Sequence, residues 1–570
     1  MFVCYLAGDA AAPSSFSAVA PPGQLELDGF GRPDGAVAAR RSTPLYGVHA
    51  YHTKVPAEAI AGFIVDHTSP GDTVLDPFCG SGMTGVAATM TGRKAVLNDL
   101  SPAAVHIATN YTTPCEPGAF EMAVARVLEN VGDEIEALYA TRHSGRPATI
   151  EYLVWSDVRR CTECGEDLLL WDHRTSGLRT VCCSGCGYEA SKATMLVVGE
   201  EAVEANLSAP GGHRRVVRSV VPDDLRPDLN LDSLPWYPST RFDSTRPMWR
   251  RGHSDLGIST VADFYSARNL KALSLLWNAA NGEPDERVRL ALRFSLTAIA
   301  NRASRRYQWN AKRPTNVLGG TLYVSSLRYE WNVLSLWRRK TRAIVRLFRS
   351  GAAVEGAVQT IRGSATRLPL PDGSIDYCFT DPPFGSHIVY SDASLLWEAW
   401  LDDLTDRASE AIVVRGGDHS KSVSDYGDLL QASFAEIRRV LRPEGKATIV
   451  FQASDPDTWS AVYKAALRAG LSFSDATTLS KGQPSFKQVK GQREGEMVAE
   501  TDVVLTFSRE PARSPAPTIN LAEAVRAAVT ARSDAGEISA GAIFGDVNAR
   551  LLRGAAEPVG IREVHDALAT

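Results

Sequence analysis

Residues 72–102 have the sequence DTVLDPFCGSGMTGVAATMTGRKAVLNDLSP. This stretch predicts a short apolar strand, a turn that contains Gly80 and Gly82, a helix of small residues, and a second strand that ends in an acid. The glycines let a ligand approach the backbone closely. Asp99 follows Asp76 by 23 positions, where an acid at a strand end can accept hydrogen bonds from ribose hydroxyls. The stretch therefore predicts an α/β fold with a nucleotide-binding half.

A second strand-end motif lies far along the chain, in GSIDYCFTDPPFGSHIVYSDASLLWEAWL at residues 373–401. Four residues directly follow its apolar strand IDYCFT, at the sheet edge where ligands bind in open α/β folds: Asp381, Pro382, Pro383 and Phe384. A base amine is a weak nucleophile because its lone pair is delocalised into the ring, so a catalyst should accept both N–H hydrogens and orient it. The Asp381 carboxylate and the Pro382 carbonyl are the predicted acceptors. Phe384 offers an aromatic face for a base that has left its stack.

The motif DPFCGSG strongly resembles the S-adenosylmethionine-binding motif of amino-methyltransferases, and DPPF resembles their catalytic motif. The resemblance implies that four residues surround the methionine part of the cofactor: Asp76, Phe78, Gly80 and Gly82. It also implies that Asp99 holds the ribose. The family usually has Thr where Met83 stands, and Thr84 is the next residue.

Two further stretches resemble cofactor-contacting segments of the same enzymes. YGVHAYHTKVPAEAIAGFI at 46–64 resembles the segment that covers the cofactor, which implies contacts from Tyr51 and Lys54. An ordinary loop that leads into an amphipathic helix is the alternative for this stretch. In IRGSATRLPLPDGSIDY at 361–377, Ser364 stands where the family often has an Asp near the cofactor adenine.

The order of cofactor motif, insert and catalytic motif is similar to the α-type arrangement of DNA amino-methyltransferases. The resemblance covers residues 45–115 and 355–508 and implies a Rossmann-like S-adenosylmethionine-dependent methyltransferase fold with a mostly parallel sheet. The predicted organisation is a flexible segment at 1–40, a cofactor half at 41–115, an inserted recognition region at 116–355, a catalytic half at 356–510, and a linker with a small helical region at 511–570.

The insert contains two cysteine pairs, in CTECGEDLLLWDHRTSGLRTVCCSGCG at 161–187. This spacing predicts a structural zinc ribbon within residues 155–195, because two C-x2-C pairs supply a closed tetrahedral site without an open position for activated water. The predicted ligands are Cys161, Cys164, Cys183 and Cys186, with Cys182 as an alternative to Cys183. A ribbon in the insert resembles the family of zinc-ribbon-containing adenine-specific DNA methylases, as does STVADFYSARNLKALSLLW at 259–277.

Charge is distributed unevenly along the chain. Residues 141–350 hold 32 Lys and Arg against 21 Asp and Glu, whereas the remainder holds 29 against 45. A basic middle suits a region that binds a polyanion, although solvated helix faces can produce the same excess. Within it, NRASRRYQWNAKR at 301–313 combines cations with aromatic rings, which predicts nucleic-acid contacts by four residues: Arg305, Arg306, Tyr307 and Trp309.

Length and composition limit the class of protein. A chain of 570 residues predicts two or more cores, and its apolar runs are far shorter than the roughly 20 residues of a membrane span. The Ala-, Ser-, Pro- and Gly-rich start reads as a lead-in rather than a signal peptide, so the expected location is the cytoplasm. The cysteines do not stand where a C5-cytosine methyltransferase would need its Pro-Cys nucleophile.

These observations predict methyl transfer from S-adenosylmethionine to N6 of adenine in DNA, in a modification or defence-type enzyme. N4 of cytosine in DNA and N2 of guanine in tRNA are the enzymatic alternatives, since tRNA enzymes of that kind also combine similar motifs. A zinc-ribbon nucleic-acid-binding protein with an inactive methyltransferase frame is the alternative from another class. DNA is the expected partner, RNA is its alternative, and restriction or defence-system components are left open.

Overall fold

The computed structural model describes residues 37–38, 45–174, 180–208, 215–225, 229, 231–310, 317–452, 456–480, 501–510, 519–531, 539–554 and 556–568. The segment predicted to be flexible, residues 1–40, lies outside these ranges except for 37–38. Of the basic and aromatic stretch at 301–313, the last three residues are likewise outside them. Among the helices in the described ranges, none is both long and apolar enough to cross a lipid bilayer.

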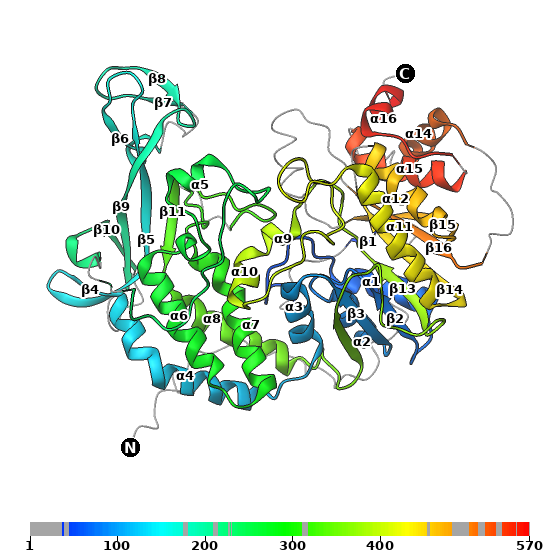
Figure 1. Ribbon diagram of the computed structural model, residues 1–570, viewed down its shortest axis with the longest axis horizontal. Coiled ribbons are helices and arrows are strands. Elements are labelled where there is room, and N and C mark those ends of the chain that lie inside the picture. Colours follow the sequence, from blue (N-terminus) through cyan, green and yellow to red (C-terminus); the bar gives the residue numbers. More distant parts are fainter. Residues whose placement is uncertain are drawn as a thin grey trace.

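An eight-stranded sheet forms the centre of the α/β part (Figure 1). In spatial order its strands are β1 (Val37–Ala38), β15 (Ser472–Ser480), β16 (Asp502–Ser508), β14 (Leu441–Phe451), β13 (Ile375–Thr380), β2 (Thr73–Asp76), β3 (Lys94–Asp99) and β12 (Val358–Arg362). Neighbouring strands are parallel except at β16, which is antiparallel to both β14 and β15. The predicted mostly parallel α/β sheet is confirmed.

The two motif-bearing halves of the chain are interleaved in this sheet. β13, from the catalytic half, pairs with β2, from the cofactor half, so that Tyr377 lies opposite Val74 and Cys378 opposite Leu75. Because successive side chains of a strand point to opposite faces, Val74 and Tyr377 enter one hydrophobic core, and Leu75 and Cys378 enter the other.

Helices cover both faces of the sheet. The first face carries α1 (Ala57–His67), α2 (Met83–Met90) and α3 (Pro102–Thr112). The second carries α11 (Val423–Val440), α12 (Pro456–Arg468), α14 (Leu521–Thr530), α15 (Ala540–Arg553) and α16 (Ile561–Leu568). The small helical region at the end of the chain therefore packs on the sheet beside the catalytic half.

The insert between α3 and β12 has a sheet and helices of its own. Its helices are α4 (Pro117–Leu138), α5 (Arg251–Asp255), α6 (Ala267–Asn281), α7 (Glu286–Ala303) and α8 (Val333–Arg349). Its strands are β4 (Ala140–His143), β5 (Arg146–Arg160), β6 (Asp167–Leu169), β7 (Thr180–Cys182), β8 (Glu189–Ser191), β9 (Leu196–Ser208), β10 (Arg215–Ser219) and β11 (Leu327–Trp331). The long antiparallel strands β5 and β9 form an arm, and β6, β7 and β8 lie at its end, far from β2 and β13 (Figure 1).

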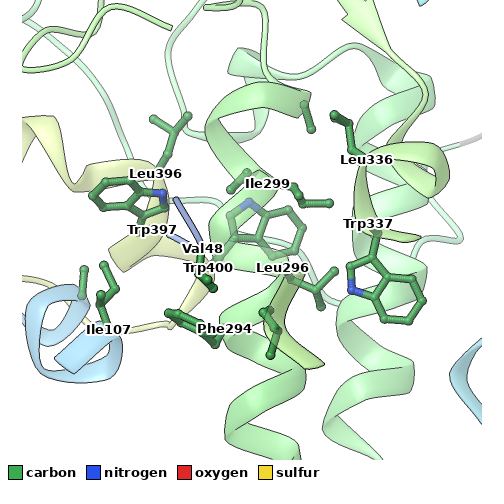
Figure 2. Close-up of a cluster of buried hydrophobic side chains, with 14 of the residues drawn as sticks. Val48, Ile107, Phe294, Leu296, Ile299, Leu336, Trp337, Leu396, Trp397 and Trp400 are labelled. Carbon is green, nitrogen blue, oxygen red and sulfur yellow. The ribbon is translucent and has the colours of Figure 1, made fainter. Parts of the chain in front are cut away.

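The insert helices and the eight-stranded sheet share one hydrophobic core. Figure 2 shows α7 between α8 on one side and α10 (Leu395–Trp400) on the other, with Phe294 and Trp397 near Ile107 of α3. Trp400 of α10 also donates its indole N–H to the Tyr265 hydroxyl of the insert, at 3.0 Å. α10 begins at Leu395, soon after Phe384 at the end of the DPPF motif. The insert therefore packs against the segment that follows this motif.

A buried ion pair makes a second connection between the insert and the catalytic half. Asp392 of α9 (Tyr390–Ala393) is fully buried and accepts from the Arg246 guanidinium at 2.9 Å. Its other carboxylate oxygen accepts the backbone N–H of Met248 at 2.8 Å. Each oxygen of this carboxylate thus accepts a hydrogen bond from the insert, which fixes α9 relative to the loop that contains Arg246.

Candidate active site

The candidate site lies where the strand order reverses. In the sheet, β3 and β12 lie on one side of β2, whereas β13 and β14 lie on the other side. Asp76 is the last residue of β2, and Asp381 directly follows β13. In open α/β sheets the crevice at the carboxyl ends of such neighbouring strands is the usual ligand site. The structure therefore brings the two motifs, 305 positions apart in sequence, to one edge of the sheet.

A cavity that is partly open to solvent occupies this edge. Its lining includes Tyr51, Thr53, Asp76, Phe78, Cys79, Gly80, Met83, Asp99, Ser101, Ser364, Thr366, Asp381, Pro383, Tyr390, Thr405, Ser409 and Glu410. Both predicted motifs and the segment from 46 to 64 contribute to it. Most of the residues predicted to hold the cofactor thus surround one space.

The loop after β2 is shaped by two glycines with positive φ. Gly80 has φ +50°, and a Cβ there would lie 2.7 Å from the Tyr51 ring, which covers the loop. Gly82 has φ +78°, and a Cβ there would lie 2.7 Å from Ala108 of α3. Gly80 therefore permits contact with a residue of the covering segment. Gly82 is outside the cavity lining, and it permits α2 to pack closely on α3.

Asp76 joins the two halves of the site. Its carboxylate accepts from the Thr84 hydroxyl at 2.6 Å and from the Thr380 hydroxyl at 2.8 Å. Thr380 ends β13, so this pair of hydrogen bonds connects the cofactor half to the catalytic half. Thr84 supplies a hydroxyl next to Asp76 although Met83 replaces the usual Thr one position earlier. Burial raises the pKa of Asp76 to about 6.

Asp99 is held by the backbone at the end of β3. Its carboxylate accepts the N–H of Gly80 at 2.8 Å and the N–H of Ser101 at 2.9 Å. These bonds favour the ionised form, but burial has the larger effect and raises the pKa of Asp99 to about 6. The carboxylate is thus fixed in orientation at the cavity wall, with capacity left to accept hydrogen bonds from a ligand.

The covering segment contributes Tyr51 but not Lys54. The Lys54 ammonium group is buried and donates to the Tyr46 carbonyl and the Tyr111 hydroxyl, each at 2.9 Å. Burial lowers the pKa of Lys54 to about 7. These contacts tie the segment to α3, so the predicted cofactor contact of Lys54 is replaced by a structural role. Ser364 lines the cavity, and its hydroxyl lies 2.8 Å from that of Thr366; its contact with the cofactor adenine stays a prediction.

The DPPF loop presents Asp381 and Pro383 to the cavity, while Pro382 and Phe384 are buried outside its lining. Phe384 is 6% exposed and contacts Phe451 edge to face, with ring centroids 5.4 Å apart. The expectation that Phe384 stacks on the target base is therefore wrong for this conformation, because its ring belongs to the core of the second sheet face. The sequence motif does not show this, since a Phe suits either environment.

Two cavity residues that the motifs did not identify are Tyr390 and Glu410. Tyr390 begins α9, and its hydroxyl lies 3.4 Å from that of Thr53. Burial is the main cause that raises the pKa of Tyr390, and nearby Asp381 adds to it, although the hydrogen bond with Thr53 acts in the opposite direction. Both residues belong to irregular or very short elements, which carry no periodic signal in the sequence.

The four cysteines of the predicted ribbon converge at the end of the arm. The Sγ atoms of Cys161, Cys164, Cys183 and Cys186 all lie within 4.8 Å of one another, with 3.8 Å between Cys161 and Cys186. Zn–S bonds of about 2.3 Å place the sulfurs of a tetrahedral site about 3.8 Å apart. The arrangement therefore suits one tetrahedral metal ion. Cys182 is exposed and outside this group.

Each cysteine pair forms the same tight turn. Gly165 donates its N–H to the Cys161 carbonyl at 3.2 Å, and Gly187 donates to the Cys183 carbonyl at 2.9 Å. Both glycines have positive φ, at +75° and +73°. A small core underlies the two turns: Cys161, Leu168, Leu170, Val181, Cys183, Ala190 and Met195. The cysteine module is therefore packed separately from the rest of the insert.

The predicted nucleic-acid contacts at 305–309 are largely corrected. Arg306 is 2% exposed, and its guanidinium donates to the Asn301 side chain and to backbone carbonyls, so it stabilises a loop inside the protein. Tyr307 is buried beside Tyr329. The prediction is wrong for these two residues because neither offers a surface to a ligand.

The other two residues of that stretch are partly accessible. Arg305 donates to Glu200 at 2.6 Å, so its charge is already compensated within the insert. Trp309 is half-buried and contacts Trp171 edge to face, with ring centroids 4.9 Å apart. Trp309 is thus the residue of this group for which contact with nucleic acid stays a prediction.

Comparisons with known proteins concern mainly the cofactor half. Residues 34–110 match the model of the N6_N4_Mtase family, described as DNA methylase. Over 67 residues the chain is 43% identical to the type II methyltransferase M.Cfr9I of Citrobacter freundii, an alignment that covers 12% of this chain and 22% of that protein. The chain thus spans about a fifth of the length of this relative.

Among solved structures, geranyl diphosphate C-methyltransferase of Streptomyces coelicolor A3(2) is similar at 10% identity, over 31% of this chain and 61% of that chain, with a TM-score of 0.16. A TehB-like SAM-dependent methyltransferase of Corynebacterium glutamicum is similar at 12% identity, over 31% and 63%, with a TM-score of 0.14. Scores this low carry no argument, so the similarity rests on sequence. The part of the chain that contains β2, β3 and the loop between them is similar to DNA methylases.

Proposed function

We propose that the protein is an S-adenosylmethionine-dependent DNA methyltransferase that acts on an exocyclic base amine, N6 of adenine. The observation that carries this proposal is the single cavity that joins Asp76 and Asp99, at the ends of β2 and β3, to Asp381 after β13. The match of residues 34–110 to a DNA methylase family supports DNA as the substrate.

The donor set of the cavity fits the cofactor. Asp99, fixed by two backbone N–H groups, accepts ribose hydroxyls. Asp76, Phe78 and Gly80 enclose the methionine part, and Tyr51 covers it from the side of the 46–64 segment. When bound, S-adenosylmethionine supplies an electrophilic methyl group on a sulfonium. Two carboxylates in a buried cavity suit this cationic ligand, because its charge compensates theirs.

Asp381 orients the target amine. Its carboxylate accepts an amine hydrogen and so directs the nitrogen lone pair out of the ring plane. The Pro382 carbonyl, predicted to accept the other hydrogen, belongs to a residue outside the cavity lining in this structure. Tyr426 donates its hydroxyl to the Pro383 carbonyl at 2.7 Å and so holds the backbone of this loop. As the nitrogen–carbon bond formed, the carbon–sulfur bond of the sulfonium would break and release a neutral thioether. The amine would lose a proton, which Asp381 is proposed to receive.

The product identifies the target. The protein, incubated with labelled S-adenosylmethionine and separate pools of unmethylated DNA and tRNA, should label DNA, and nucleoside analysis should find N6-methyladenine. Label in N4-methylcytosine would change the base, and label only in N2-methylguanosine of tRNA would overturn the proposal. Absence of cofactor binding would favour the non-enzymatic alternative.

Cofactor affinity should depend on pH near 6. Asp76 and Asp99 are stronger hydrogen-bond acceptors, and compensate a cationic ligand, while they are ionised. Their raised pKa values of about 6 mean that protonation begins there rather than near pH 4. The dissociation constant should be nearly constant above pH 7 and should increase roughly tenfold per pH unit below 6 for each carboxylate that must ionise. Calorimetric titration with S-adenosylmethionine from pH 8 to pH 5 measures it.

Asp99→Asn provides the control for this pH dependence. It should bind more weakly at pH 8 and show a shallower decrease at low pH, because only Asp76 still titrates in this part of the cavity. An affinity in the wild-type protein that stays unchanged down to pH 5 would argue against ionised Asp76 and Asp99 as cofactor ligands.

We also propose that the four cysteines of the arm bind one structural zinc ion. Their thiolates fill a tetrahedral coordination shell, so the ion has no open position for a substrate or an activated water. The ion would hold the two turns together at the end of the arm.

A further inference from the structure

A buried carboxylate behind the cavity wall connects the cofactor half to the segment that follows the DPPF motif. Glu398 of α10 is 1% exposed and lies outside the cavity lining. Its Oε1 atom accepts the hydroxyls of Ser101 and Thr405, each at 2.6 Å, and its Oε2 atom accepts the Thr405 backbone N–H at 2.9 Å. Ser101 and Thr405 both line the cavity. Glu398 thus joins two parts of the wall that are 304 positions apart in sequence.

The Ser101 end of this connection reaches the predicted ribose ligand. The Ser101 backbone N–H donates to Oδ1 of Asp99 at 2.9 Å, and the Gly80 N–H donates to Oδ2 at 2.8 Å. The Ser101 hydroxyl begins α3 and accepts the Ala104 N–H at 3.3 Å. Its one hydrogen goes to Glu398, so Ser101 is held from both sides. A series of hydrogen bonds therefore runs from Gly80 through Asp99 and Ser101 to Glu398.

The Thr405 end is anchored to the sheet. Thr405 lies in the loop after α10, and the Arg362 guanidinium, at the end of β12, donates to the Leu404 carbonyl of the same loop at 3.2 Å. β12 pairs with β3, so that Arg362 lies opposite Asp99. The carboxylate of Glu398 is therefore connected to two neighbouring strand ends, on the side of the cavity where Asp99 lies.

A carboxylate suits this place because it offers acceptors only. Three donors from Ser101 and Thr405 converge on it, and among the described residues no Lys or Arg compensates its charge. A buried acid without an ion pair costs stability, and apolar side chains would join the same segments without that cost. What the hydrogen bonds add is a fixed orientation of the residues that they hold.

We infer that Glu398 is a positioning residue for cofactor binding: it fixes Ser101 and, through the Ser101 backbone N–H, the direction in which the Asp99 carboxylate receives the ribose hydroxyls. Glu398 itself touches no ligand, since it lies outside the cavity lining. This inference rests on the proposed function and deepens it, because it places control of cofactor affinity in a residue of the catalytic half.

Substitution of Glu398 should change cofactor affinity more than turnover. Glu398→Ala should raise both the KM for S-adenosylmethionine and the dissociation constant of S-adenosylhomocysteine by about tenfold, the effect of about one lost hydrogen bond. At saturating cofactor, kcat should change less than about threefold, since Asp381 acts on the amine from another strand end. A smaller fraction of folded enzyme would have the opposite signature, a lower kcat with an unchanged KM.

Glu398→Gln should recover most of the affinity. Its amide oxygen can accept the Thr405 N–H, and its amide hydrogens can be donated to the Ser101 and Thr405 hydroxyls, which are able to accept. The matched control is Asp392→Ala, which removes a buried carboxylate from the neighbouring helix α9 but does not interrupt the series that ends at Asp99. This control should lower the unfolding temperature and leave cofactor affinity within about twofold of the wild type.

A double-variant cycle tests the path through Ser101. Ser101→Ala removes the hydroxyl but keeps the backbone N–H, so it should weaken binding of S-adenosylhomocysteine by a factor similar to that of Glu398→Ala. If Glu398 acts through Ser101, the double variant should bind no more weakly than Glu398→Ala alone, whereas independent effects would multiply. Calorimetric titration of the four proteins measures this coupling without any DNA.

The outcomes are distinguishable. If the wild type binds neither S-adenosylmethionine nor S-adenosylhomocysteine, the proposed function fails. If it binds them, and folded Glu398→Ala binds as tightly or the effects of the two substitutions multiply, the inference about Glu398 fails. If Glu398→Ala does not fold, Ser101→Ala decides: wild-type affinity in this variant would overturn the inference by itself, and a loss of about tenfold would support it.

Discussion

Asp381→Ala is expected to abolish methyl transfer while leaving cofactor affinity within about twofold of the wild type. In the proposed mechanism the carboxylate both orients the target amine and receives its proton, so its removal should lower kcat by at least about a thousandfold, as for other groups that act only in the transition state. The cofactor contacts of Asp76 and Asp99 lie on the neighbouring strands and should persist. Single-turnover rates and calorimetric titration with S-adenosylmethionine measure the two effects.

Asp381→Asn distinguishes the two tasks of the carboxylate. Its amide oxygen still accepts a hydrogen from the amine but takes up no proton, so this variant should retain measurable turnover, well below the wild type and above Asp381→Ala. Thermal unfolding of both variants shows whether the loop after β13 stays intact. A folded Asp381→Ala protein with wild-type turnover would refute the catalytic assignment.

Cys164→Ser is expected to release the metal from the arm. The wild-type protein should contain about one zinc ion per chain, because four thiolates complete one tetrahedral site. With one ligand lost, the two turns should separate, and the module should become sensitive to protease between 161 and 191, since its own core is small. DNA affinity should decrease, whereas cofactor affinity should not, because the cavity is built on a different core.

Cys182→Ser is the matched control for this experiment. Cys182 lies next to Cys183 and is exposed, but its sulfur is outside the cluster. This variant should keep its zinc and its resistance to protease. A folded, zinc-free wild-type protein in which all four clustered cysteines react with a thiol reagent would exclude the site.

The sequence predicted those parts of the site whose chemistry is local. Each of three predicted strands ends in or is directly followed by an acid: Asp76 in DPFCGSG, Asp99 after KAVLN, and Asp381 in DPPF. The sequence therefore predicted that these acids lie at one edge of the sheet. The cysteine pairs were predictable for the same reason, since each C-x2-C-G turn is complete within a few residues.

The parts that failed depend on tertiary contacts. A buried arginine that donates to backbone carbonyls and an exposed arginine can have the same neighbours in sequence. The sequence therefore could not show that Arg306 is buried. Phe384 was misplaced because the partner of its ring, Phe451, comes from another strand. Glu410 was missed because its value as a site residue arises from burial beside Asp392, Tyr390 and the cavity, which no spacing in the chain records.

The place of β13 between β2 and β14 also determines when the protein can become complete during synthesis. β2 leaves the ribosome about 300 residues before β13, a delay of roughly 15 to 60 s at 5–20 residues per second. During that time the edge of β2 that β13 will cover has no partner strand, and unpaired edges invite wrong pairing. The entire arm and its cysteines are translated first. No nascent chain that ends before Asp381 contains all the residues that line the cavity, so the insert is always made before the site is complete.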